Sequence, residues 1–510
     1  MKQYYLGIEF GSTRVKAVLI DGEHRIVKSG DYTWKSSLEN GVWTYHMEDV
    51  QTGLRTAIRN LGELPGAVSA MGISGMMHGY LAFDKDWNLL APFRTWQNTM
   101  TGEAADKLTE AFGFNIPQRW SIAHLYQAVL NGEAHVKNIA HITTLAGYVH
   151  YLLTGENVLG VGEASGMFPI DSEALDYDAA MLEKFDALIA KYGFAWTARS
   201  VLPKVLTAGQ AAGALTQAGS TFLDGLLSAG IPFCPPEGDA GTGMTATNAV
   251  APRTGNVSAG TSIFAMVVLE KPLSKVYQEI DMVTTPSGKP VAMVHCNNCT
   301  NDMNAWVSLL GETAKLFGAE VSTGELFTKL YQKSLEGDAD CSGVLTYNYM
   351  AGEGITHLDE GRPMVVRKPE SKFTLANFLR SQLYATMATL KLGMDILAGE
   401  HVAIDSLTGH GGLFKTPGVG QKYMAAACRA PVTCMESAGE GGPYGMALLA
   451  SYLVQKQDGQ TLEQYLETEI FADVKRTTLA PDPEDEAGFD RYLSWYRSAL
   501  AAENAAVKAF

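Results

Sequence analysis

The sequence is poor in several features that mark particular classes of protein. It has six cysteines in 510 residues, too few for the disulfide framework that stabilises small secreted domains. No uncharged apolar run reaches the roughly 20 residues that a membrane-spanning helix needs. The start, "MKQYYLGIEF", lacks the apolar core and cleavage site of a secretory signal. We therefore expect a cytoplasmic protein with reduced thiols and no membrane partner.

Positive charge is also scarce. Asp and Glu outnumber Lys and Arg by 55 to 39, which gives a net charge of −16. Such a surface repels nucleic acid and anionic lipid, so neither is expected as a partner. A phosphate group can still bind, because a local cluster of backbone N–H donors attracts an anion whatever the net charge.

The strand–loop–helix phosphate loop, GxxxxGK[ST], is missing as well. The chain has instead a Gly-Ser-Thr turn between two β-rich runs, "FGSTRVKAVLID" from residue 10, and a similar turn, "SAGTSIFAMVVLE", from residue 258. Glycine lets an anion approach the backbone and hydroxyls add donors, although an ordinary β-hairpin needs the same residues. Two such turns, one in each half, favour a pair of phosphate-binding turns.

The length exceeds what one hydrophobic core usually organises. Strand-like runs, such as 4–10, 15–21, 68–75 and 401–409, alternate with helical patterns, such as 48–64, 375–399 and 489–510. This alternation predicts an α/β architecture. The Gly-turn pattern returns after "APRTG", so we expect an internal repeat with domains at 1–252 and 253–510.

Several segments resemble, in the same order from residue 4 to about 452, the motifs of the FGGY carbohydrate kinases, which belong to the actin/hexokinase superfamily. "GIEFGSTRVKAVLID" and "GNVSAGTS" resemble their two phosphate motifs, and "MGISGMMHG" the sugar-side loop of the xylulokinase and ribulokinase branch. "GIPFCPPEGDAGTG" is similar to the segment with the catalytic Asp, "YNYMAGEGITHLDEGRP" to the "GERTPH" stretch, and "LTGHGGLFKTPG" to the adenosine region. The resemblance implies two actin-like (ribonuclease H-like) α/β domains with a catalytic cleft between them.

The resemblance also implies ATP and Mg²⁺, and it makes Asp239 the general base that accepts the proton of the sugar hydroxyl. Without it, the sequence favours a turn Asp that caps the following helix, and the resemblance reverses this preference. Glu9 stands where the family usually has Asp. With Asp239 it is expected to hold Mg²⁺; the alternative is an exposed Glu at a strand end.

Other roles follow from the same resemblance. The residues expected to bind ATP are Gly11, Ser12, Thr13, Lys16, Gly260, Thr261, Ser262, Gly409, Gly411, Gly412 and Leu413. Those expected to bind the sugar are Met77, His78, Trp96, Glu163 and Asp239. A solvated Lys16, a structural His78 and a loop carboxylate at Glu163 are the alternatives.

Besides Glu9, four positions depart from the family pattern. Asn98 and Met100 stand where the family commonly has Asp and Arg, Ala240 replaces the amide common after the base, and Tyr384 replaces a helix Glu. These changes fall mainly on the sugar side. They therefore affect the expected identity of the sugar more than the expected class of reaction.

We therefore expect an ATP-dependent kinase that phosphorylates a terminal hydroxyl of a ketose. The expected ketose is a pentulose such as xylulose or L-ribulose. The resemblance also implies a homodimer. Alternatives are a kinase of another polyol, a hexulose or a linear signalling sugar, and, in another class, a non-catalytic ATP- and sugar-binding actin-like module. The presence of Asp239 argues against the last, because binding alone needs no base. The "CNNC" pair at 296–299 has no second pair at zinc spacing, so thiols are expected there.

Overall fold

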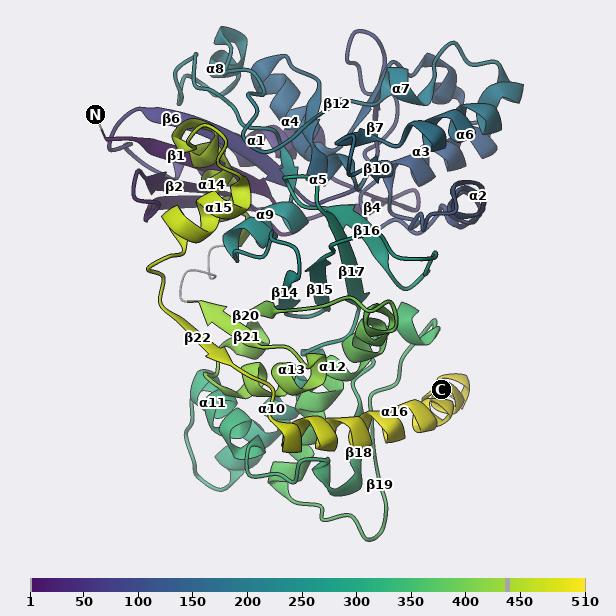
Figure 1. Ribbon diagram of the computed structural model, residues 1–510, viewed down its shortest axis with the longest axis vertical. Helices are drawn as coiled ribbons and strands as arrows, with labels where there is room; N and C mark the ends of the chain where they lie inside the picture. Colours follow the sequence, from purple (N-terminus) through teal and green to yellow (C-terminus); the bar gives the residue numbers. More distant parts are fainter. Residues whose placement is uncertain (1, 436–440, 510) are drawn as a thin grey trace. The chain divides into compact units, whose positions relative to one another are not determined.

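The computed structural model describes residues 2–435 and 441–509 (Figure 1). The chain divides into two compact units. The first takes residues 1–252, 268–291 and 440–474, and the second takes residues 253–267, 292–439 and 475–510. The domain limits 1–252 and 253–510 stay a prediction. The first unit also includes two later segments, residues 268–291 and 440–474, which that prediction did not contain.

The first unit is built on a mixed sheet with the strand order β13-β6-β1-β2-β3. Its strands are β1 (Tyr4–Phe10), β2 (Arg14–Asp21), β3 (Ile26–Thr33), β6 (Val68–Gly75) and β13 (Glu237–Gly238). β1, β2 and β3 are antiparallel neighbours, whereas β6 lies parallel to both β1 and β13. The expected strands at 4–10, 15–21 and 68–75 are confirmed.

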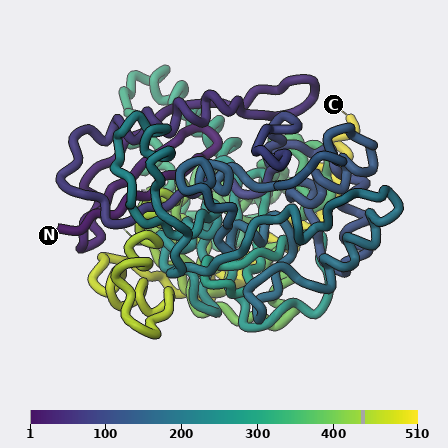
Figure 2. The backbone as a smooth tube through the Cα atoms, turned by 90° about the horizontal axis from the view of Figure 1, so that it is seen from above, coloured from purple at the N-terminus to yellow at the C-terminus, as the bar shows by residue number. Residues whose placement is uncertain are grey.

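Helices cover both faces of this sheet because small residues let them approach. A Cβ at Gly7 or Gly72 would overlap atoms of α14 (Gly441–Gln455), and one at Gly30 would overlap the backbone of α1 (Met47–Arg59). Figure 2 shows the yellow-green segment that holds α14 beside the purple N-terminal strands. A segment more than 400 residues away in sequence is therefore part of the first core.

The first unit also contains shorter helices and strands outside this sheet. Its helices also include α2 (Gly102–Phe112), α3 (Ser121–Leu130), α4 (Leu145–Thr154), α5 (Val161–Ala164), α6 (Ala179–Ile189), α7 (Ala198–Val201), α8 (Gln217–Phe222), α9 (Asp239–Ala246) and α15 (Leu462–Tyr465). Its short strands are β4 (Ser37–Glu39), β5 (Val42–Thr44), β7 (Leu81–Phe83), β8 (His141–Thr143), β9 (Val158–Gly160), β10 (Ile170–Asp171), β11 (Asp176–Tyr177), β12 (Lys204–Leu206) and β16 (Asp281–Thr284).

The second unit repeats the plan of the first. Its strands follow the order β17-β15-β14-β20-β21-β22. They are β14 (Thr254–Ala259), β15 (Ile263–Val268), β17 (Pro290–Cys296), β20 (Ser406–Gly411), β21 (Val432–Met435) and β22 (Arg476–Leu479). β14 is antiparallel to β15 and parallel to β20, as β1 is to β2 and β6. The structure thus confirms the internal repeat.

The helices of the second unit pack around α12 (Leu375–Gly399), a long buried helix that the sequence predicts with these bounds. The others are α10 (Asn301–Leu316), α11 (Thr323–Ser334), α13 (Val419–Cys428) and α16 (Pro483–Ala509), and a separate hairpin joins β18 (Val344–Tyr347) to β19 (Met364–Arg367). None of the helices in residues 2–435 and 441–509 has the length and apolar character needed to cross a membrane.

Candidate active site

The first Gly turn, at residues 11–13, closes the β1–β2 hairpin. Trp34 donates twice to it, from Nε1 to Gly11 O (2.7 Å) and from its backbone N–H to Thr13 O (3.1 Å). Tyr45 Oη donates to Ser12 O (2.7 Å). All three carbonyls of the turn therefore accept hydrogen bonds from the protein. Within residues 2–435 and 441–509, no hydrogen bond uses the amides of Ser12 and Thr13.

The second Gly turn, at residues 260–262, has the same arrangement in the second unit. Thr300 donates to Gly260 O from its N–H (3.2 Å) and from its hydroxyl (2.7 Å). The N–H of Cys299 donates to Thr261 O (3.0 Å), and the N–H of Gly260 donates to Ser262 O (2.9 Å). In the described part of the chain, the amides of the second and third residues of each turn make no hydrogen bond, so they can donate to an anion, as a phosphate-binding turn requires.

A row of polar residues crosses the sheet of the first unit at the level of Glu9. The register pairs Glu237 with Ser74, Ser74 with Glu9, and Glu9 with Lys16. Because paired residues of neighbouring strands point to the same face, these four side chains share the face that α14 covers. Lys16 is thus part of a polar row beside the first turn.

Glu9 is half-buried in this row. Burial, with the charge of Asp239 in second place, raises the pKa of Glu9 to about 8, although Lys16 opposes the shift. Its Oε2 atom has no hydrogen-bond partner within residues 2–435 and 441–509. A Cβ at Gly442, in the first turn of α14, would overlap this oxygen. The missing side chain at Gly442 therefore gives the carboxylate its room.

Asp239 is the first residue of α9, directly after the edge strand β13. Its Oδ1 accepts a hydrogen bond from the N–H of Met77 (3.2 Å). The N-cap of α9 is Gly238, so Asp239 is not the capping residue. Its side chain is exposed, while desolvation by the surrounding protein raises its pKa and backbone N–H groups oppose that shift. An accessible carboxylate with a raised pKa has the properties of a general base.

Met77 and His78 form the loop after β6, and both are buried. His78 has a left-handed backbone (φ 68°), and the hydrogen bond between its Nδ1 and Gly166 O (3.0 Å) holds the ring. A Cβ at Gly166 would lie 2.8 Å from this nitrogen. Since Met77 also holds Asp239, the structure brings the predicted sugar-side loop and the predicted base together.

Glu163 and Glu237 are two fully buried acids in the same region. The N–H of Glu163 donates to Glu237 Oε2 (2.9 Å). Burial is the main cause that raises the pKa of Glu237 to about 8 and that of Glu163 well above its ordinary value. A Cβ at Gly238 would overlap Glu163 Oε2, which places this carboxylate against Gly238, the residue before Asp239. Sequence reasoning missed Glu237, whose one signal is its position in "EGDAG".

The loop after β7 places the remaining sugar-side candidates. Trp96 is 39% exposed, and its role in the site stays a prediction. Asn98 is buried: its Oδ1 accepts from the N–H of Trp43 (2.8 Å), and its Nδ2 donates to Trp43 O (2.8 Å) and Thr95 O (3.0 Å). The side-chain amide of Asn98 therefore holds strand β5 in place, and its hydrogen bonds go to Trp43 and Thr95. Met100 is 39% exposed.

The glycines of the predicted adenosine region lie at the end of β20 in the second unit. Gly409 pairs with Val257 in β14, and a Cβ at Gly409 would contact the ring of Phe414 at 2.5 Å. Gly411 has φ 99°, which a residue with a side chain rarely adopts, and Gly412 next to it is exposed. Leu413 is fully buried, with its backbone oxygen against Gly420, and its role in ATP binding stays a prediction.

Comparison with known proteins covers almost the whole chain. The model of the FGGY carbohydrate kinase N-terminal domain matches residues 4–245, and that of the C-terminal domain matches residues 255–454. A xylulose kinase of Haemophilus influenzae is 22% identical, over 96% of this chain and 99% of its own. A glycerol kinase of Thermococcus kodakarensis is 26% identical, over 53% of this chain and 54% of its own.

Solved structures show the same fold. The xylulose kinase of Lactobacillus acidophilus has a TM-score of 0.80 at 16% identity and covers 98% of this chain and 99% of its own. The xylulose kinase of Rhodospirillum rubrum has a TM-score of 0.79 at 18% identity, over 98% of both chains. With both family domains matched along its length, the chain belongs to the FGGY family of carbohydrate kinases.

Proposed function

We propose that this kinase transfers the γ-phosphate of ATP to the terminal hydroxyl of a ketose, and that the ketose is a pentulose such as xylulose or L-ribulose. The observation that carries the proposal is the placement of Asp239. It is an accessible acid, bound by the N–H of Met77 in the same loop as His78, and it lies beside the buried acids Glu163 and Glu237. The similarity to a xylulose kinase over nearly the full chain supports the acceptor class.

The chemistry follows from these groups. Asp239 accepts the proton of the sugar hydroxyl as its oxygen attacks the γ-phosphorus, and the bond to the β-phosphate oxygen breaks. Its raised pKa brings its proton affinity closer to neutral pH, where a base is most effective. The donors of the turns at 11–13 and 260–262 hold the phosphates through backbone N–H groups and hydroxyls.

Magnesium fits the acids of the first unit. Glu9 Oε2 is a buried oxygen without a hydrogen-bond partner among the described residues, and Asp239 adds a second carboxylate. In the described part of the chain, no cluster of three or more His, Cys, Asp and Glu side chains could hold a metal. Two carboxylates, completed by phosphate and water oxygens, suit Mg²⁺. The ion would neutralise phosphate charge during transfer.

A second acceptor class has its own support. Glycerol kinases match 36–53% of this chain at 23–26% identity. In addition, Asn98, at a position where the family commonly has Asp, uses its amide to hold Trp43. A linear polyol is therefore the competing acceptor.

An assay with a panel of acceptors distinguishes a pentulose kinase from a polyol kinase. ADP formation would be followed by a coupled assay with xylulose, L-ribulose, hexuloses, glycerol and other polyols, each at several concentrations. We expect the highest kcat/KM with a pentulose. A polyol with the highest kcat/KM would replace the pentulose, and no turnover with any acceptor would favour a non-catalytic binding module.

A further inference from the structure

Trp34 and Tyr45 form an aromatic pair behind the first Gly turn. Trp34 follows β3 and Tyr45 follows β5, and both are buried, with 6% and 3% of their surface exposed. Their rings stack with centroids 4.3 Å apart and planes inclined by 30°, and Phe10 meets the Trp34 ring edge-on at 5.9 Å. Such packing fixes the two rings at the base of the hairpin.

Among the residues that the structure describes, Trp34 and Tyr45 donate the hydrogen bonds that the three turn carbonyls accept from outside the hairpin. Trp34 binds the carbonyls of Gly11 and Thr13, and Tyr45 binds the carbonyl of Ser12. A peptide plane whose carbonyl is held from one side presents the following N–H to the other side. The bonds to Gly11 O and Ser12 O therefore set the direction in which the amides of Ser12 and Thr13 point, and the bond to Thr13 O does the same for the amide of Arg14.

We propose that Trp34 and Tyr45 are positioning residues for nucleotide binding: by holding the carbonyls of residues 11–13, they orient the amides of the turn towards the phosphates of ATP. The proposal rests on the proposed function of the turn. The second turn supports it, because Cys299 and Thr300 donate from outside that turn to the carbonyls of Thr261 and Gly260.

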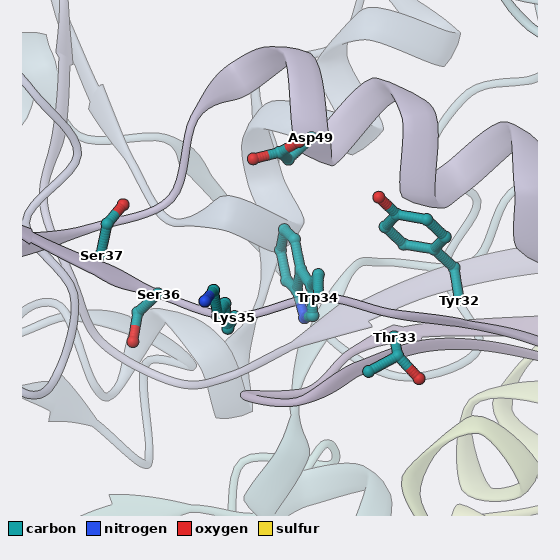
Figure 3. Close-up of a pocket in the computed structure, with 7 residues that line it drawn as sticks. All are labelled: Tyr32, Thr33, Trp34, Lys35, Ser36, Ser37 and Asp49. Atoms are coloured by element: carbon teal, nitrogen blue, oxygen red, sulfur yellow. The ribbon is translucent and has the colours of Figure 1, made fainter.

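The packing around Trp34 and Tyr45 determines which substitution removes a hydrogen bond with the least other change. Figure 3 shows Trp34 among the residues that line a pocket, which are residues 32–37 and Asp49. The volume of this cavity is about 430 Å³. A smaller ring at position 34 has room to shift into this cavity, so Trp34→Phe changes both a hydrogen bond and the packing. Tyr45→Phe removes a single oxygen atom and is the primary variant.

The first unit offers matched controls that lie outside the site. Tyr452 Oη donates to Gln460 O (2.7 Å), and Trp196 Nε1 donates to Val136 O (2.8 Å). Both side chains are buried, with 4% and 7% exposed. Tyr452→Phe and Trp196→Phe therefore remove equivalent hydrogen bonds to backbone carbonyls without touching the turn.

The test measures the Kd of ATP by calorimetry on the full chain, together with the KM of the best sugar and the thermal midpoint. A hydrogen bond of this kind is worth about a fivefold change in an equilibrium constant. We expect Tyr45→Phe and Trp34→Phe each to weaken ATP binding about fivefold, while the sugar KM and the thermal midpoint match those of the controls.

Two results would overturn the inference: an ATP Kd no weaker than in the control variants, or an equal loss of ATP binding, sugar binding and thermal midpoint. The first would show that the turn keeps its direction without these bonds, and the second would show a purely structural role. Failure of the proposed function is recognised separately, since wild-type protein would then bind ATP but phosphorylate no acceptor in the panel.

Discussion

Glu353 allows a stability prediction that depends on one buried acid. Its Oε2 accepts hydrogen bonds from the N–H groups of Asn297 (3.0 Å) and Asn298 (3.3 Å) and from Asn298 Nδ2 (3.1 Å). Its Oε1 has no partner within residues 2–435 and 441–509, and 1% of the side chain is exposed. Burial outweighs these donors and raises the pKa of Glu353 from 4.5 to about 7.

The sign and size of the effect follow from this pKa. Between about pH 4.5 and pH 7, Glu353 holds its proton in the folded protein and loses it in the unfolded chain. The free energy of unfolding therefore falls as pH rises through this range. A tenfold difference in proton affinity is worth about 1.4 kcal/mol. Ionisation of Glu353 in the folded protein then costs about 3 kcal/mol at pH 8 and under about 1 kcal/mol at pH 5.

Glu353→Gln removes this titration and keeps the size of the side chain. We expect its stability relative to wild type to improve by about 2 kcal/mol between pH 5 and pH 8, or by roughly 4–8 °C in the unfolding midpoint of a unit of this size. Thermal unfolding followed by circular dichroism at both pH values measures it. Glu370→Gln, at an exposed position in the same unit, is the control. An identical pH dependence in Glu353→Gln and wild type would refute the reasoning.

Three further predictions concern the site. Thr13→Ala removes a donor hydroxyl from the first turn and should raise the KM for ATP about fivefold with the sugar KM unchanged; equal effects on both substrates in steady-state kinetics would contradict this. Gly442→Ala places a Cβ on Glu9 Oε2, so the unfolding midpoint should fall and kcat should drop at least about tenfold; wild-type values would show that Glu9 is free to move. His78→Ala should raise the sugar KM about tenfold and leave the Kd of ATP unchanged by calorimetry, whereas an unchanged sugar KM would remove His78 from the sugar site.

The local pattern predicts much of the fold. Two β-rich runs around a Gly turn predict both hairpins, and the long apolar pattern predicts α12, because each depends on residues close in sequence. The strand expected over 401–409 is wrong at its start. β20 begins at Ser406, opposite the first residue of β14, Thr254, so in the part of the chain that the structure describes β14 does not extend beside residues 401–405.

The parts that escaped prediction depend on contacts between distant segments. Glu237 approaches Glu163 because β13 joins the edge of β6 and the short helix α5 packs beside it. The return of α14 to the first sheet depends on the missing side chains at Gly7 and Gly72. Neither glycine lies in a turn, so a single sequence shows no reason for them. The predicted base, Asp239, was found through a motif resemblance rather than through any local pattern.

The most direct test of the central claim is the turnover of Asp239→Asn with the best acceptor of the panel, measured together with its Kd for ATP. Asn keeps the size of the side chain and the oxygen that faces the N–H of Met77 but cannot accept the proton of the sugar. We predict that kcat falls by about 10²–10⁴ while the Kd for ATP stays within about twofold of wild type. Full turnover in this variant would show that another group removes the proton and would contradict the account.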